Sequence, residues 1–199
     1  MSSLIDGLMG QLGGDALGNL AGQLGTDKTK AQAGMAAALP LLLGALSRNA
    51  QSNDGAASLG AALERDHDGS ILDNAAGFFG SGDTSMGAGI LKHVLGAKQD
   101  RAAQGVSKAS GLDPATAGKM LTLLAPMVLG ALGKAKRQGG LDTAGLANML
   151  GGERQAMEKK APQLGMLGAL LDQDGDGDMD ANDIAKLGGG MLGKLFGGK

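Results

Sequence analysis

Residues 117–132 read AGKMLTLLAPMVLGAL, and residues 31–46 read AQAGMAAALPLLLGAL. Each segment is apolar nearly all round a helix, which indicates either central burial in a protein core or insertion in a membrane. A membrane span needs about 20 apolar residues, and each of these segments is shorter and contains a proline. We therefore expect two core helices, kinked or divided at Pro40 and Pro126, because proline removes a backbone hydrogen bond and clashes with the preceding turn.

The two segments belong to an internal repeat. The pattern Pro-x-x-x-Gly-Ala-Leu at residues 40–46 recurs at residues 126–132. The same separation relates residues 25–27 to 111–113 and residues 8–10 to 94–96, and a one-residue slip relates Leu59 and Leu63 to Leu146 and Leu150. This regularity predicts two copies of one helical unit that bury their apolar faces together. Gly44 and Gly130 should then lie at equivalent close contacts.

The predicted fold class is all-α, because no segment shows the alternation of a half-buried strand. We expect an internally duplicated helical bundle over residues 1–152, followed by a C-terminal helix–loop–helix over residues 162–199. Within the bundle, repeat one covers about residues 2–65 and repeat two about residues 88–152. A linker at about residues 66–87 joins them.

Helix boundaries can be placed at several polar residues. The first repeat should start with helices over residues 2–12 and 15–24. The expected N-caps are Asp15, Asp27 and Asp113, since a short side chain with an acceptor oxygen satisfies the first backbone N–H groups of a helix. The chain has 38 Gly residues, which predicts helices that pack closely and helices that end on glycine caps.

Residues 172–183 read DQDGDGDMDAND and fit the twelve-residue calcium loop of an EF-hand. Gly177 stands where the loop turns sharply, and Met179 occupies the apolar position. The predicted ligands are Asp172, Asp174, Asp176, Asp178 through its backbone carbonyl, Asp180 and Asp183. Six carboxylates this close together repel one another unless a cation compensates them. The predicted cofactor is therefore Ca²⁺.

A solvated acidic linker is the alternative interpretation of this segment. Apolar residues at helical spacing on both sides favour the calcium loop: Leu164, Leu167, Leu170 and Leu171 before it, and Ile184, Leu187, Met191, Leu192, Leu195 and Phe196 after it. The segment resembles EF-hand and dockerin-type helix–loop–helix units. Asp183 is one methylene shorter than the usual Glu, which predicts weaker affinity or more competition from magnesium. A single loop also lacks the partner with which such units pair, which disfavours a calmodulin-like switch.

Composition excludes several classes of protein. The chain has no Cys, so disulfides and thiolate zinc sites are excluded. Its 18 basic and 20 acidic residues give a net charge of -2, without the basic excess that nucleic-acid binding requires. The only aromatic residues are Phe78, Phe79 and Phe196, too few for base or sugar stacking.

The sequence gives little reason to expect an enzyme. Its two histidines are His67 and His93, and no nucleophile or phosphate-binding motif is present. The group Asp66, His67, Asp68 and Asp73 could hold a second cation, but its spacing fits a turn with a helix N-cap better. His93 lies on an apolar helix and is interpreted as a packed or half-exposed structural residue. We therefore expect a non-catalytic protein.

A family resemblance rests on the paired Gly-x-Asp and Pro-x-x-x-Gly-Ala-Leu patterns, on Asp-Gly-Ser-Ile-Leu-Asp at 68–73 and on Gly-Ile-Leu-Lys-His at 89–93. With these motifs, residues 2–150 resemble the bacterial domain-of-unknown-function family 937, also called YidB-like. The resemblance implies an all-helical fold and a bacterial source. It carries over no activity and no catalytic residues.

Three functions remain open at the level of sequence. The first is a calcium-binding structural or interaction protein, the second a self-assembling homo-oligomer in which calcium is incidental, and the third a membrane-active helical protein. We expect no nucleic-acid partner, and the sequence names no protein partner. No signal peptide is recognisable at the N-terminus, so a cytoplasmic location is expected, with leaderless export as the alternative.

Overall fold

The computed structural model describes residues 4–160. Within this range the protein is all-α, as predicted, and contains no strand. The helices in chain order are α1 (Leu4–Gln11), α2 (Gly14–Leu24), α3 (Lys28–Asn49), α4 (Asn53–Arg65), the short η1 (Ser70–Asn74), α5 (Ala75–Ser81), α6 (Ser85–Val94), the short η2 (Gly96–Lys98), α7 (Gln99–Ser110), α8 (Pro114–Gly139) and α9 (Thr143–Lys160). The chain divides into two units, Met1–Arg154 and Gln155–Lys199, and the following description concerns the first.

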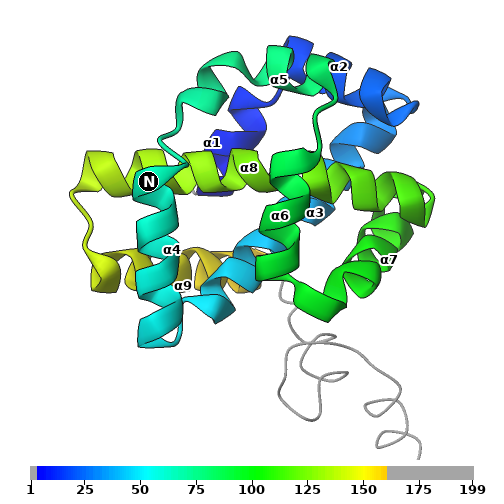
Figure 1. Cartoon of the computed structure of the whole chain (residues 1–199). Helices are drawn as coiled ribbons and strands as arrows, with labels where there is room; N and C mark the ends of the chain where they lie inside the picture. Colours follow the sequence, from blue (N-terminus) through cyan, green and yellow to red (C-terminus); the bar gives the residue numbers. More distant parts are fainter. Residues whose placement is uncertain (1–3, 161–199) are drawn as a thin grey trace, which may run out of the picture. The chain divides into compact units, whose positions relative to one another are not determined.

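Helix α8 forms the centre of this unit. It runs through the middle of the arrangement in Figure 1 and packs against α3, α4, α6, α7 and η1. Every residue from Leu123 to Gly133 is buried. A helix that is apolar on all sides can be accommodated only where neighbours cover all sides, and in this unit that place is the centre of the helical arrangement.

Both proline-containing helices continue past their prolines. α3 has 22 residues with Pro40 inside it, and α8 has 26 residues with Pro126 inside it. The alternative that proline divides each helix in two is therefore wrong. The sequence-based length argument against a membrane is also wrong for α8, which in the described part of the chain is the one helix long and apolar enough to span a bilayer. Burial is the better criterion, since 72% of its apolar window is covered by the protein, as in the core helix of a soluble domain.

Helix α3 is buried on one face only. Its inward face includes Met35, Leu39 and Leu42, each at most 1% exposed. Its opposite face is apolar but partly open to solvent, and consists of Ala33, Ala36, Ala37, Pro40, Leu41 and Gly44. α3 is thus a peripheral helix, although its residues 31–46 are apolar nearly all round the helix.

Helix ends follow local rules in both halves of the unit. The Asp27 side chain accepts a hydrogen bond from the Lys30 N–H at 2.8 Å, and the Asp113 side chain accepts one from the Thr116 N–H at 3.0 Å. Both aspartates are N-caps, as predicted. The prediction for Asp15 is wrong, because α2 begins at Gly14 with Gly13 as its N-cap, so Asp15 lies inside the helix. Gly111, which ends α7, has a φ of 71°, a left-handed conformation that glycine adopts without strain.

The segment interpreted as a linker is itself folded. It contains η1 and α5, and its Phe79 is fully buried. Side-chain amides of α1 and α2 bind successive backbone carbonyls of this segment: Gln11 Nε2 donates to Leu72 O at 3.3 Å, Asn19 Nδ2 to Ala76 O at 2.9 Å and Gln23 Nε2 to Gly80 O at 3.0 Å. α5 consequently packs along α2.

Three glycines allow backbones to approach α8. A β-carbon on Gly87 of α6 would lie 1.8 Å from the carbonyl oxygen of Thr122, and one on Gly133 would lie 1.8 Å from the carbonyl oxygen of His67. A β-carbon on Gly130 would lie 2.7 Å from Ile71 Cγ2, whereas a β-carbon on Gly44 would meet no atom within 4 Å apart from the backbone of its own helix. The expectation that Gly44 and Gly130 lie at equivalent close contacts is therefore wrong.

Candidate functional site

The predicted calcium loop falls outside the part of the chain that the structure describes. This applies to all six predicted ligands, Asp172, Asp174, Asp176, Asp178, Asp180 and Asp183. Within residues 4–160, no group of three or more His, Asp or Glu side chains is arranged to hold a metal ion. The calcium prediction thus rests on the sequence of the loop.

The acidic group near residues 66–73 forms a turn, as preferred from its spacing. Asp68 Oδ1 accepts hydrogen bonds from the N–H of Ser70 at 2.9 Å and from the Ser70 hydroxyl. These bonds, the hydroxyl first, lower the pKa of the Asp68 carboxyl. Gly69 has a φ of 91°, which a residue with a β-carbon rarely adopts. The turn leads from α4 into η1.

The other carboxylates around this turn are engaged by protein cations. Asp66 pairs with Arg65, whose Nη2 lies 2.7 Å from Asp66 Oδ2, and this hydrogen bond lowers the Asp66 pKa. Asp73 lies 3.7 Å from Lys134 Nζ. Glu64 accepts a hydrogen bond from Lys136, which lowers the Glu64 pKa. The three carboxylates are thus directed to three different basic residues and do not converge on a common point.

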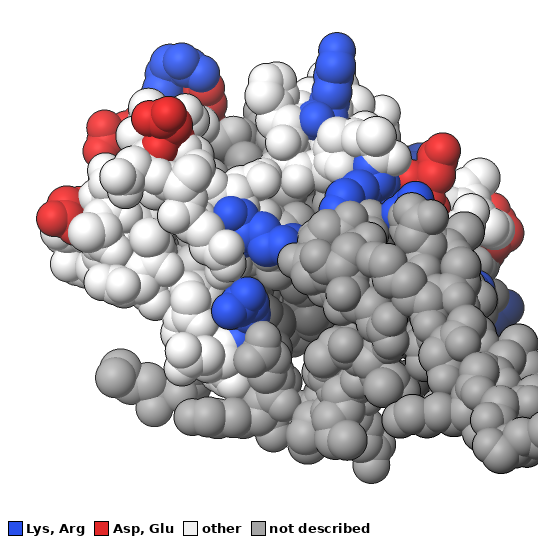
Figure 2. Space-filling model, turned by 90° about the horizontal axis from the view of Figure 1, so that it is seen from below, with Lys and Arg blue, Asp and Glu red and all other residues white. Residues whose placement is uncertain are grey.

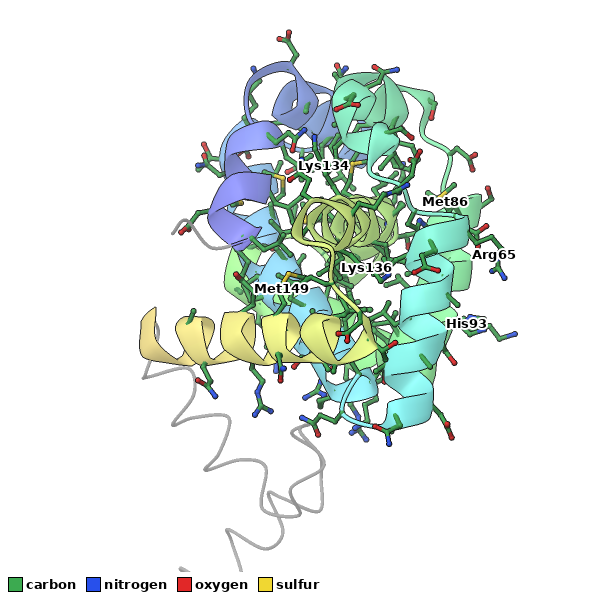
Figure 3. All side chains as sticks on the ribbon, turned by 90° about the vertical axis from the view of Figure 1, so that its left-hand side faces the viewer. Arg65, Met86, His93, Lys134, Lys136 and Met149 are labelled. Carbon is green, nitrogen blue, oxygen red and sulfur yellow. The ribbon has the colours of Figure 1, made fainter. Side chains whose placement is uncertain are left out.

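The two lysines that pair with Asp73 and Glu64 belong to α8. Figure 3 looks nearly along this helix, and Lys134 and Lys136 project from different sides of it. Lys134 reaches η1 and Lys136 reaches α4, so the turn between those elements is anchored at both of its ends. The Lys136 side chain is only 13% exposed, so this pair is better shielded from solvent than the Arg65–Asp66 pair.

The two histidines lie in opposite environments. His67 is 9% exposed, and burial lowers its pKa; Asp66 acts in the opposite direction and Arg65 in the same direction. His93 is exposed, so of the two expected positions, packed or half-exposed, the packed one is wrong. Its Nδ1 lies 3.0 Å from the Gly89 carbonyl oxygen of its own helix. Neither histidine belongs to a metal-binding cluster in the described residues.

One residue that sequence reasoning missed joins the two ends of the described unit. Glu153 Oε1 accepts a hydrogen bond from the backbone N–H of Leu4 at 3.0 Å. That N–H belongs to the first turn of α1, whose donors lack partners within the helix, and a carboxylate is favoured there by the helix dipole. The two residues are far apart in the sequence, so no local pattern could have indicated the pair.

The face seen in Figure 2 mixes both signs of charge. Lys and Arg side chains lie both near its middle and at its upper edge, Asp and Glu lie towards its edges, and uncharged residues separate many of them. Residues 1–154 contain 13 basic and 13 acidic residues, so they carry no net charge. The charged side chains of the described residues that are visible in this view are thus of both signs.

Comparison with known proteins places residues 6–135 in a family of bacterial proteins of unknown function, DUF937. The match covers more than half of the chain. The protein belongs to this DUF937 family. No match was found among curated proteins or among solved structures. The match runs from α1 into α8, so it includes the acidic turn and both N-cap aspartates, and it ends before α9 and the calcium-loop sequence.

Proposed function

We propose that this DUF937 protein is a non-catalytic calcium-binding helical protein that serves a structural or interaction role. The proposal rests on the register of residues 172–183, in which Asp occupies each side-chain ligand position and Gly177 the sharp turn. The distribution of charge along the chain supports the proposed calcium site. The first 154 residues are neutral, whereas this loop has six acidic residues and no basic one.

We also propose that the DUF937 unit arose by internal duplication. The helix order α2, α3, α4 corresponds to α7, α8, α9, and α3 and α8 begin at matching Asp N-caps. Each is preceded by a helix that ends at a left-handed glycine, Gly25 or Gly111. α3 has 22 residues and α8 has 26, a difference of about one helical turn, which leaves the exit direction of the chain nearly unchanged.

Calorimetric titration of the full chain with calcium tests the proposed site. We expect binding to one site, loss of binding in Asp172→Ala, and a mild effect of Asp178→Ala, which supplies only its backbone carbonyl. Magnesium as competitor measures selectivity. Equal effects of the two substitutions, or no heat of binding in the unaltered chain, would contradict the proposal.

Asp183→Glu tests the proposed reason for weak affinity. If the short carboxylate limits the grip on the ion, the added methylene should tighten calcium binding and improve discrimination against magnesium. Unchanged or weaker binding would mean that the chain after the loop is already adjusted to Asp.

Self-association is a second candidate function, favoured by the partly open apolar face of α3. Its members Ala36, Ala37, Pro40 and Leu41 offer no charge that would oppose contact with a second copy. Sedimentation over a range of concentrations, with and without calcium, distinguishes this function from a monomeric calcium protein. The burial of α8 gives no support to the membrane-active alternative, which flotation with liposomes would test.

A further inference from the structure

The α4–η1 turn meets α8 backbone to backbone. A β-carbon on Gly133 would lie 1.8 Å from the carbonyl oxygen of His67, and one on Gly69 would lie 3.1 Å from the carbonyl oxygen of Gly130. Contacts of this kind cannot adjust by rotation of a flexible side chain. A disturbance in the turn must therefore be absorbed by movement of the backbone away from α8.

His67 stands at the point of closest approach. Although it lies in a turn, it is only 9% exposed. A neutral imidazole is tolerated at such low exposure more readily than a charged one. A charged imidazolium at the same place would lose hydration that the surrounding side chains do not replace.

Of the charges next to His67, Asp66 favours an imidazolium and Arg65 opposes it, and the effect of burial on the His67 pKa outweighs that of Asp66. On its own side of the contact lie Glu64, Arg65, Asp66, Asp68 and Asp73, and on the α8 side lie Lys134, Lys136 and Arg137. Glu64, Asp66 and Asp73 are already paired with Lys136, Arg65 and Lys134, and Asp68 accepts from Ser70. An added positive charge would compete with cations that these carboxylates already bind.

We propose that the α4–η1 turn is an acid-sensitive clasp, in which protonation of His67 releases residues 64–74 from α8. The release would uncover Leu72 and the α8 surface at Gly130 and Gly133. The proposal is independent of calcium binding, because none of the predicted calcium ligands takes part in it.

The direction of the pH effect follows from the burial of His67. Burial lowers the His67 pKa in the folded protein. His67 therefore binds a proton more readily when the turn is released than when the turn is packed against α8. The clasp is stable above the ordinary histidine value of 6.5 and weakens as the pH falls from there towards the folded-state pKa. The pKa values of Glu64, Asp66 and Asp68 are lowered from values that are already below that window, so these groups keep their charge.

Amide hydrogen exchange of the full chain tests the clasp, with rates corrected for the intrinsic effect of pH. Between pH 6.5 and the folded-state pKa, protection of residues 64–74 should fall by up to about tenfold per pH unit, while the buried centre of α8 keeps its protection. His67→Gln should remove this pH dependence. His93→Gln is the matched control, since it removes the exposed histidine and should leave the dependence intact.

A second measurement covers the case in which His67→Gln does not fold. The chain has two histidines, so two imidazole signals are expected by NMR, and His93→Gln assigns them. The His67 signal should titrate below 6.5, together with the signals of the turn amides. Unchanged protection of residues 64–74 across this range, or release that persists in His67→Gln, would overturn the proposal.

Discussion

Helices α3 and α8 have similar N-termini and similar sequences, but they lie in different environments. Both follow a left-handed glycine and an Asp N-cap, and both carry proline, glycine, alanine and leucine in the same order. The centre of α8, from Leu123 to Gly133, is covered on all sides, whereas α3 leaves an apolar face partly open. The comparison indicates that an apolar sequence alone does not make a helix central. The segments that pack against each helix decide which of the two is buried at the centre of this unit.

The glycine positions display the difference most clearly. Ile71 of η1 packs against Gly130, and the backbone of His67 packs against Gly133. Gly44 matches Gly130 in the repeat, but a β-carbon on Gly44 would meet no other segment within 4 Å. The segment between α4 and α6 packs on α8, and no described residue closes over Gly44 in the same way.

The largest expected effect is that of Gly133→Ala. The added methyl group would fall 1.8 Å from the His67 carbonyl oxygen, so the turn or the helix must move. We expect a loss of about 3 kcal/mol or more in the free energy of unfolding, measured by urea denaturation. Gly118→Ala in the same helix is the control, because its nearest contact would be Ala103 Cβ at an ordinary 3.7 Å.

A matched pair with effects of opposite sign tests the comparison directly. Gly130→Ala should reduce the free energy of unfolding by about 1–2 kcal/mol, because its methyl group would meet Ile71 Cγ2 at 2.7 Å. Gly44→Ala should increase it by about 0.5–1 kcal/mol, because alanine favours the helix and the site has room. Two changes of the same sign would mean that α3 and α8 are covered more evenly than described here.

The smallest effects should come from the two N-caps, where the helices are alike. Asp27→Ala and Asp113→Ala each remove one side-chain acceptor at an exposed helix start, so thermal melting should show similar small losses. Hydrogen bonds from Thr116 lower the Asp113 pKa from 3.8, so this cap is stabilising above that value and is lost as the pH falls through the lowered pKa. A much larger loss at Asp113 would show that the central position of α8 also makes its start more important.

Sequence patterns predicted several parts of this fold because those parts depend on neighbours along the chain. The helix expected at 15–24 is observed as Gly14–Leu24, and Asp27 and Asp113 cap their helices as expected, whereas Asp15 does not. The turn at Asp68 also follows from its own residues, since Ser70 binds back to it. Whether His93 is packed or exposed could not be decided from its sequence, because an apolar helix does not reveal which of its faces is covered.

The sequence by itself determined that the described unit is all-α, where its two apolar helices begin, and which residues form the predicted calcium loop. These properties depend on periodicity, capping and ligand spacing, which are local. Only the tertiary structure decided that α8 is central and α3 peripheral, that His67 is buried, and that Glu153 caps α1. Each depends on residues far apart in the sequence, since burial is set by the surface that a distant segment covers.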